Sequence, residues 1–151
     1  SSSGTYTYFK EHALFKGDFR EGVKEQAGSS SVVQAVSSDK YAIGYSGIGA
    51  KTDGVRAVSL AAGAGKPAVA AELAHAYDGT YPMARFLYVY VNLKPGTEPA
   101  PLQREFLRYI LSKEGQSEVI KEGFFPLTAD ITTRSLASVG LKPLAVEAGA
   151  K

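Results

Sequence analysis

The run SSSGTYTYFKEHAL, residues 1–14, places serines, a glycine and a threonine directly before a segment with the pattern of a helix. Residues 6–15 contain no glycine or proline, and their apolar residues recur at a helical interval. Ser3 or Thr5 is expected to cap this helix, because a hydroxyl oxygen at the N-cap accepts a hydrogen bond from the first turn. The same turn has unpaired N–H groups and about half a positive charge, so it also suits an anion.

The composition is that of a folded globular domain. Of the 151 residues, 44% are hydrophobic and 21% are charged, and one domain is the expectation for this length. The 17 Lys and Arg against 15 Asp and Glu give a formal charge of only +2, so we expect no nucleic-acid partner. The chain contains no cysteine, which excludes disulfides, thiolate metal ligands and a cysteine nucleophile.

Helical and extended patterns alternate along the chain, which predicts the α/β fold class. After the first helix, further helices are expected at residues 28–40, 67–77, 102–112, 114–121 and 129–140. Strands are expected at the beginning of residues 41–50, which then become a glycine-rich loop, and at residues 55–60 and 85–93. The last of these, RFLYVYVNL, is aromatic and β-branched throughout and is expected to be covered on both faces.

Three glycine-rich stretches resemble catalytic or nucleotide motifs, and each fails at a required position. Ser46 would be the central serine of a nucleophile elbow, but Ile48 stands two places later, where that motif needs glycine. A phosphate-binding loop is excluded because Leu60 replaces its first glycine and Pro67 its serine or threonine. The dinucleotide fingerprint fails at Thr52, which stands in place of its last glycine.

The histidines also give no sign of a catalytic or metal site. His12 and His75 each stand alone in a helical segment, without a second ligand three or four residues away. We expect both in surface or packing roles, no metal and no cofactor. Since spacing does not select a catalytic triad either, we expect a binding protein and not an enzyme.

At this point the sequence resembles the periplasmic phosphate-binding proteins, the substrate-binding components of phosphate ABC transporters. The resemblance begins in residues 1–14, where Ser-Gly-Thr and an aromatic pair open a helix. It continues through VKEQAGSSSVVQAVSSDKYAIGYSGIG at 23–49 and YPMARFLYVYVNLKPG at 81–96. FLRYILSKEGQSEVIKEGFFPL at 106–127 follows in the same order, so the similarity covers residues 1–127.

The resemblance implies that Ser3, Gly4 and Thr5 bind phosphate through hydroxyl and backbone N–H groups. The family's arginine, four residues before that serine, falls outside this sequence when counted back from Ser3. The family's remaining ligands, among them the aspartate that accepts a phosphate proton, belong to the first part of the protein. The resemblance therefore implies an incomplete site and a chain that is one piece of a longer protein.

In fold, the resemblance implies a type 2 periplasmic-binding-protein-like arrangement of two lobes, of which this chain represents the C-terminal half. Residues 1–82 are expected to complete the second lobe and carry the anion site. Residues 83–151 are expected to cross between the lobes and return to the first. The implied partners are inorganic phosphate, an ABC transporter permease and the N-terminal half of the same protein, in the periplasm or outside the cell.

Two alternatives stay open on the sequence. The first keeps the fold and changes the ligand to another tetrahedral oxyanion such as sulfate, because the residues that discriminate the two lie outside this sequence. The second is a secreted phosphatase or other serine hydrolase, for which Ser3 would be the nucleophile. Hydrolysis of a chromogenic phosphate ester that is lost on Ser3→Ala would favour the second.

Overall fold

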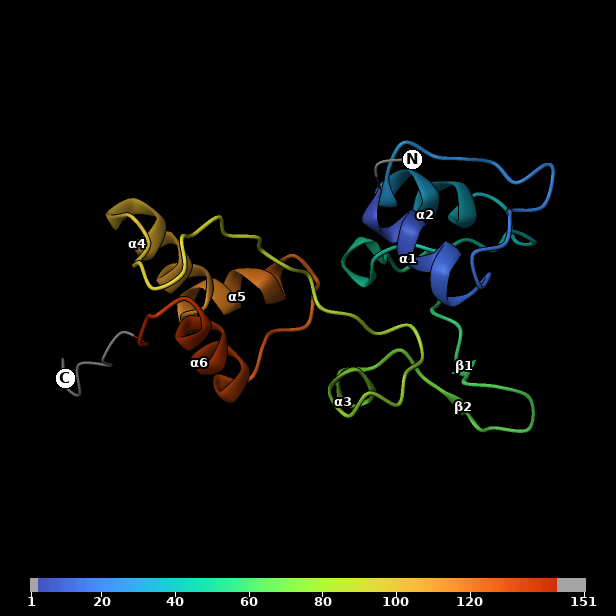
Figure 1. The fold of residues 1–151 in the computed structure, drawn as a ribbon. Coiled ribbons are helices and arrows are strands. Elements are labelled where there is room, and N and C mark those ends of the chain that lie inside the picture. Colours follow the sequence, from blue (N-terminus) through green and yellow to red (C-terminus); the bar gives the residue numbers. More distant parts are fainter. Residues whose placement is uncertain (1–2, 144–151) are drawn as a thin grey trace. The chain divides into compact units, whose positions relative to one another are not determined.

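The computed structural model describes residues 3–143 and divides into two compact units, Ser1–Leu87 and Tyr88–Lys151 (Figure 1). The first unit contains α1 (Gly4–His12), α2 (Ser29–Ser37), the 3-10 turn η1 (Ile48–Ala50), β1 (Leu60–Ala61), β2 (Ala68–Val69) and α3 (Leu73–Tyr77). The second contains α4 (Pro101–Ile110), α5 (Lys113–Lys121) and α6 (Ala129–Ser138). The described residues are thus mostly helical or irregular, with little sheet.

Helix α1 begins where its sequence provides a cap. The Ser3 side chain accepts a hydrogen bond from the Tyr6 N–H at 3.3 Å, which confirms Ser3 as the capping residue. The helix spans Gly4–His12, beginning and ending earlier than the predicted 6–15. Phe15 and Lys16 adopt positive φ angles of 50° and 67°, a conformation that an α-helix excludes.

Stacked aromatic rings join α1 to two loops of the first unit. The rings of Phe9 and Tyr45 lie 4.0 Å apart between centroids and are nearly parallel, and Phe19 lies 6.0 Å from Tyr45. Tyr6 also contacts Phe19, at 5.0 Å. Offset aromatic pairs contribute about 0.5–1.5 kcal/mol beyond the burial of their area, so this cluster fixes the orientation of α1.

The loop after α2 packs closely against that helix. A side chain at Gly44 would meet Val32 and Val36 at 2.8 and 3.0 Å, so only glycine fits here. Residues 41–46 form no strand, contrary to prediction. Tyr41 and Ile43 are 84% and 83% exposed, so these apolar side chains are not covered within residues 3–143.

The only strand pairing among residues 3–143 is the short antiparallel ladder of β1 and β2. The predicted strand at 55–60 is wrong except for Leu60, which pairs with Val69. The predicted helix at 67–77 is half wrong: Ala68–Val69 is extended, and only Leu73–Tyr77 is helical. The turn at Gly63–Lys66, with Gly65 at φ 74°, reverses the chain, so ladder pairing overrides the helix propensity of the alanines.

The predicted strand at 85–93 is also not formed within the described residues. Its aromatic and β-branched residues favour an extended backbone, but a strand also requires a neighbour for its N–H and C=O groups. Residues 86–90 lie exposed, with Tyr90 at 92%, so the expected cover on both faces is absent from residues 3–143. The strand propensity of these side chains therefore does not by itself predict a sheet, which also needs a neighbouring strand.

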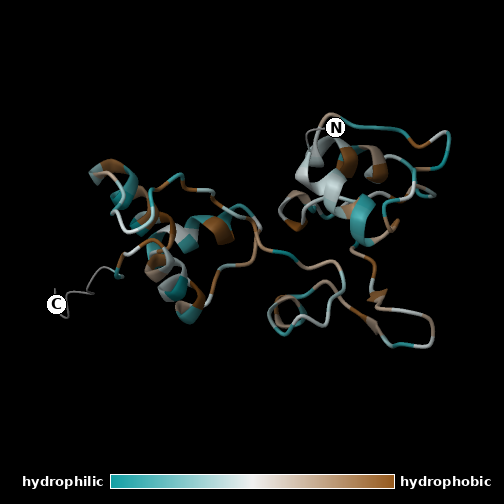
Figure 2. Cartoon of the chain, in the orientation of Figure 1, coloured by the Kyte–Doolittle hydropathy of each residue, from teal (hydrophilic) through white to brown (hydrophobic). Residues whose placement is uncertain are grey.

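The second unit has its core among α4, α6 and the residues after α6. Leu107, Leu136 and Leu141 are buried together, and Val91 and Ile110 pack against them. Figure 2 shows both apolar and hydrophilic residues along these helices. This arrangement places a small leucine core inside a three-helix unit.

Helical spacing in residues 102–112 predicts a buried face of Leu102, Phe106, Tyr109 and Ile110, and this prediction is only partly right. Leu102, Phe106 and Tyr109 are exposed, whereas Leu107 and the partly buried Ile110 face the core. Apolar residues lie on more than one side of this helix, so periodicity alone selected the wrong side. The predicted helices at 102–112, 114–121 and 129–140 are otherwise confirmed as α4, α5 and α6 within a few residues.

Helix α5 starts immediately after α4, and the connection leaves no room for a side chain at Gly115. The Ser112 hydroxyl caps α5 by accepting from the Gly115 N–H at 3.1 Å. The Gln116 side chain donates to the Ile110 carbonyl at 2.7 Å and accepts from the Leu127 N–H at 2.6 Å. These bonds tie the N-terminal half of α5 to the end of α4 and to the segment that follows α5.

Gly115→Ala is expected to destabilise the second unit by about 2 kcal/mol, the usual cost of overpacking. The new methyl group would collide with the Tyr109 carbonyl oxygen and lie 2.9 Å from the Ile110 Cα, and both obstacles are backbone. Urea unfolding measures the change. Gly63→Ala is the control, because a methyl group there meets nothing within 4 Å, and equal stabilities of the two variants would contradict the prediction.

Candidate functional site

The three residues implied by the resemblance lie together at the start of α1. Ser3 is the N-cap, and Gly4 and Thr5 are the first two helical residues. By helix geometry, the N–H groups of Gly4 and Thr5 have no intrahelical acceptor, whereas that of Tyr6 is bound by Ser3. Two backbone donors and the positive end of the helix dipole therefore meet at this point.

A third polar side chain, which the sequence did not indicate, lies beside Ser3 and Thr5. The Arg85 Nη2 atom donates to the Thr5 Oγ1 atom at 3.2 Å, across 80 positions of sequence. A Cβ atom at Gly4 would lie 3.7 Å from Arg85 Nη1, which shows how near the guanidinium is to the helix start. The absence of a side chain at Gly4 leaves this approach open.

Tyr8 supports the guanidinium. Arg85 lies over the Tyr8 ring, with its Cζ atom 5.1 Å from the ring centroid, in a cation–π arrangement. The Tyr8 hydroxyl donates to the carbonyl oxygen of Ala84, the residue before Arg85, at 3.0 Å. The His12 ring also stacks on the Tyr8 ring, with the two centroids 4.0 Å apart. Tyr8 thus links α1 to residues 84–85.

Among the described residues of the first unit, one ion pair includes a residue of α1. Lys10 and Asp18 pair at 2.9 Å, and their hydrogen bond raises the pKa of the Lys10 ammonium and lowers the pKa of the Asp18 carboxyl. None of the ion pairs found among residues 3–143 includes Arg85. The positive charge of Arg85 is therefore not neutralised by a carboxylate in the described part of the chain.

Of the two histidines, His12 is exposed at the end of α1 and His75 is partly buried in the middle of α3. His12 Nδ1 lies 3.0 Å from the Tyr8 carbonyl oxygen, and His75 Nδ1 lies 3.1 Å from Thr80 Oγ1. Within residues 3–143, no group of three or more His, Asp or Glu side chains is placed to hold a metal ion. No helix in the same residues is both long and apolar enough to cross a lipid bilayer.

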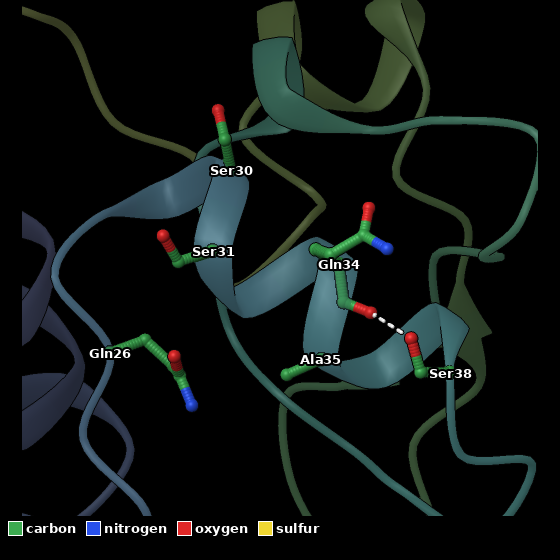
Figure 3. A pocket seen from close by; sticks show the side chains of 6 residues that line it. All are labelled: Gln26, Ser30, Ser31, Gln34, Ala35 and Ser38. Atoms are coloured by element: carbon green, nitrogen blue, oxygen red, sulfur yellow. Dashed lines mark hydrogen bonds between the residues drawn. The ribbon is translucent and has the colours of Figure 1, made fainter.

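An open hollow lies on the surface of α2 (Figure 3). It is lined by Gln26, Ser30, Ser31, Gln34, Ala35 and Ser38. All of these are exposed, and the Ser38 hydroxyl donates to the helix carbonyl of Gln34 at 2.9 Å. Without a buried or charged group in its lining, this hollow has less to offer an anion than the start of α1.

Arg85 is the residue that sequence reasoning missed. The stretch YPMARF assigned it to the beginning of a strand, and nothing local relates that position to residues 3–5. The one sequence feature that could have pointed to Arg85 is that a charged residue stands directly before the apolar residues 86–91. Together, the described groups at α1 form a set of hydrogen-bond donors with two sources of positive charge, which is suited to holding an oxyanion.

Comparison with known proteins assigns the family. The family model of the PBP superfamily domain matches residues 1–114, which is most of the chain. The chain belongs to the PBP superfamily.

Within it, the chain is similar to proteins named phosphate-binding protein PstS, which confirms the resemblance found in the sequence. PstS of Pseudomonas aeruginosa is 52% identical over 141 residues, which are 93% of this chain and 44% of that protein. PstS of Staphylococcus saprophyticus is 29% identical over 77% of this chain and 36% of its own length. Protein SphX of Synechococcus elongatus is 31% identical over 88% of this chain and 40% of its own length. The chain thus spans less than half the length of these relatives.

Proposed function

We propose that this chain contributes the α1 side of a cleft that binds inorganic phosphate. The observation that supports this most is the position of Ser3, Gly4 and Thr5 at the start of α1, in a chain 52% identical to a phosphate-binding protein. Phosphate oxygens would accept from the Gly4 and Thr5 N–H groups and from the Ser3 and Thr5 hydroxyls. Hydrogen bonds to a charged group contribute about 1.5–3 kcal/mol each, so each of these donors would add to the affinity of the complete site.

The complete site is proposed to lie between two lobes. Residues 1–82 would belong to the second lobe, and residues 83–151 would cross and pack on the first, which the N-terminal half of the same protein supplies. The exposed apolar residues at 86–90 support this division, because burying them against further chain would be favourable at about 25 cal/mol per Å². Closure of the lobes would then remove water from the anion and add its remaining donors.

The proposed role is transport, without a chemical reaction on the phosphate. The protein would capture phosphate in the periplasm or outside the cell and deliver it to the permease of an ABC transporter. The names of the relatives support the ligand. The geometry of Ser3 is consistent with a binding role, since its oxygen is held by the Tyr6 N–H as a helix cap.

Thr5→Val is expected to weaken phosphate binding by the complete protein about tenfold, which corresponds to about 1.4 kcal/mol. The substitution removes the hydroxyl and keeps the shape of the side chain. Since Ser3 and not Thr5 caps α1, the helix itself should persist. Isothermal titration calorimetry with phosphate measures the change.

Thr7→Val provides the matched control for this experiment. Thr7 lies on the same helix, is exposed, and its hydroxyl donates to the Ser3 carbonyl at 3.3 Å. We expect this variant to bind phosphate within twofold of the parent. An unchanged constant for Thr5→Val, or equal losses in both variants, would contradict a ligand role for Thr5.

A further inference from the structure

The position of Arg85 is unusual for an exposed arginine. Its guanidinium is held by the Thr5 hydroxyl at 3.2 Å and by the face of Tyr8, and it lies beside Gly4, where a Cβ atom would be 3.7 Å away. Tyr8 is in turn fixed by its hydrogen bond to Ala84. The guanidinium is therefore oriented from two sides and directed to the first turn of α1.

This position brings two positive groups together. The N-terminus of a helix carries about half a positive charge, and Arg85 adds a full one. No ion pair within residues 3–143 supplies Arg85 with a carboxylate. Repulsion between these groups is relieved when an anion binds next to both of them, so the local charge favours an occupied site.

The hydrogen bond between Arg85 and Thr5 also has a direction. A guanidinium has donors and no acceptor, so the Thr5 oxygen must accept in this bond. The proton of the Thr5 hydroxyl is then directed away from Arg85, on the side where the proposed oxyanion would accept it. Arg85 thus selects the rotamer in which Thr5 acts as a donor.

We propose that Arg85 is a positioning residue of the anion site, which holds the Thr5 hydroxyl as a donor and adds positive charge next to a tetrahedral oxyanion. This inference rests on the proposed function, because it presupposes that phosphate binds at residues 3–5. It adds to the site a side chain from a distant segment, residues 84–85, that lies outside the Ser-Gly-Thr run.

The test compares variants of the complete protein by calorimetry with inorganic phosphate. Arg85→Met keeps most of the apolar length and removes the charge and the donors, and we expect affinity to fall about tenfold. Arg85→Lys, which keeps a cation and donors, is expected to stay within threefold of the parent. The matched control is Arg56→Met, because Arg56 is an exposed arginine of the same unit that belongs to none of the ion pairs in residues 3–143, and it should bind as the parent does.

A double-mutant cycle separates positioning from a merely structural effect. If Arg85 acts through Thr5, Arg85→Met should cost less than threefold in affinity when Thr5 is already valine. An Arg85→Met variant that binds as the parent does, or losses that simply multiply in the double variant, would overturn the inference. If instead the parent protein itself fails to bind phosphate, the proposed function has failed, and the two failures are therefore distinguishable.

Discussion

Gly4→Asp is expected to weaken phosphate binding by at least about 100-fold, or about 2.7 kcal/mol, without unfolding the protein. The new carboxylate would stand at the first helical residue, within reach of Arg85, whose Nη1 is 3.7 Å from the Cβ position. It would occupy the place proposed for the anion and repel phosphate from there. Calorimetry with phosphate measures the loss.

The effect on stability should have the opposite sign. An acidic residue in the first turn of a helix contributes about 0.3–1 kcal/mol through the helix dipole. The melting temperature of Gly4→Asp should therefore equal or exceed that of the parent. A loss of binding accompanied by a higher melting temperature excludes misfolding as its cause.

Gly28→Asp serves as the matched control. Gly28 is the N-cap of α2, and a Cβ atom there meets nothing within 4 Å. The substitution introduces the same charge at another helix start of the same unit, so phosphate affinity should change by less than twofold. Comparable losses in both variants would show that net charge, and not occupation of the α1 site, governs binding.

The second large effect concerns the chain by itself. We expect residues 1–151 alone to bind phosphate no more tightly than about 1 mM, which is about 4 kcal/mol. The donors at α1 contribute about 1.5–3 kcal/mol each, while association costs an estimated 4 kcal/mol or more and the phosphate must lose part of its hydration. Little net affinity remains without the opposite lobe.

A form of the protein as long as its relatives should bind at least about 1,000-fold more tightly, because closure of two lobes supplies the missing donors and removes water. Titration of both forms under the same buffer and salt measures the difference. Micromolar binding by residues 1–151 alone would contradict the proposed division of the site between lobes.

The parts that could be predicted from sequence depend on interactions between near neighbours. Ser3 caps α1 through a residue three positions away, and Ser112 and Thr128 cap α5 and α6 in the same way. Capping and helical periodicity are local, so these helices and the position of the Ser-Gly-Thr run at a helix start were accessible without a structure. The division at residues 82 and 83 stays a prediction.

The extended segments show where this reasoning ends. The residues at 85–93 have every side-chain preference of a strand, yet a strand exists only when a neighbour accepts and donates its backbone hydrogen bonds. Ala68–Val69, with helix-favouring surroundings, became extended because Leu60–Ala61 lies opposite. Strand pairing depends on which two segments lie side by side in the folded chain, and the conformational preferences of single residues do not specify this.

The sequence by itself therefore determined the helix start that carries Ser3, Gly4 and Thr5, and the family to which the chain is similar. Only the tertiary structure placed Arg85 against Thr5, across 80 positions, and showed that Leu107 and not Phe106 faces the core of the second unit. The physical reason is that caps and dipoles arise within one helical turn. Contacts between distant residues depend instead on how the stacked aromatic rings and the leucine core pack the chain.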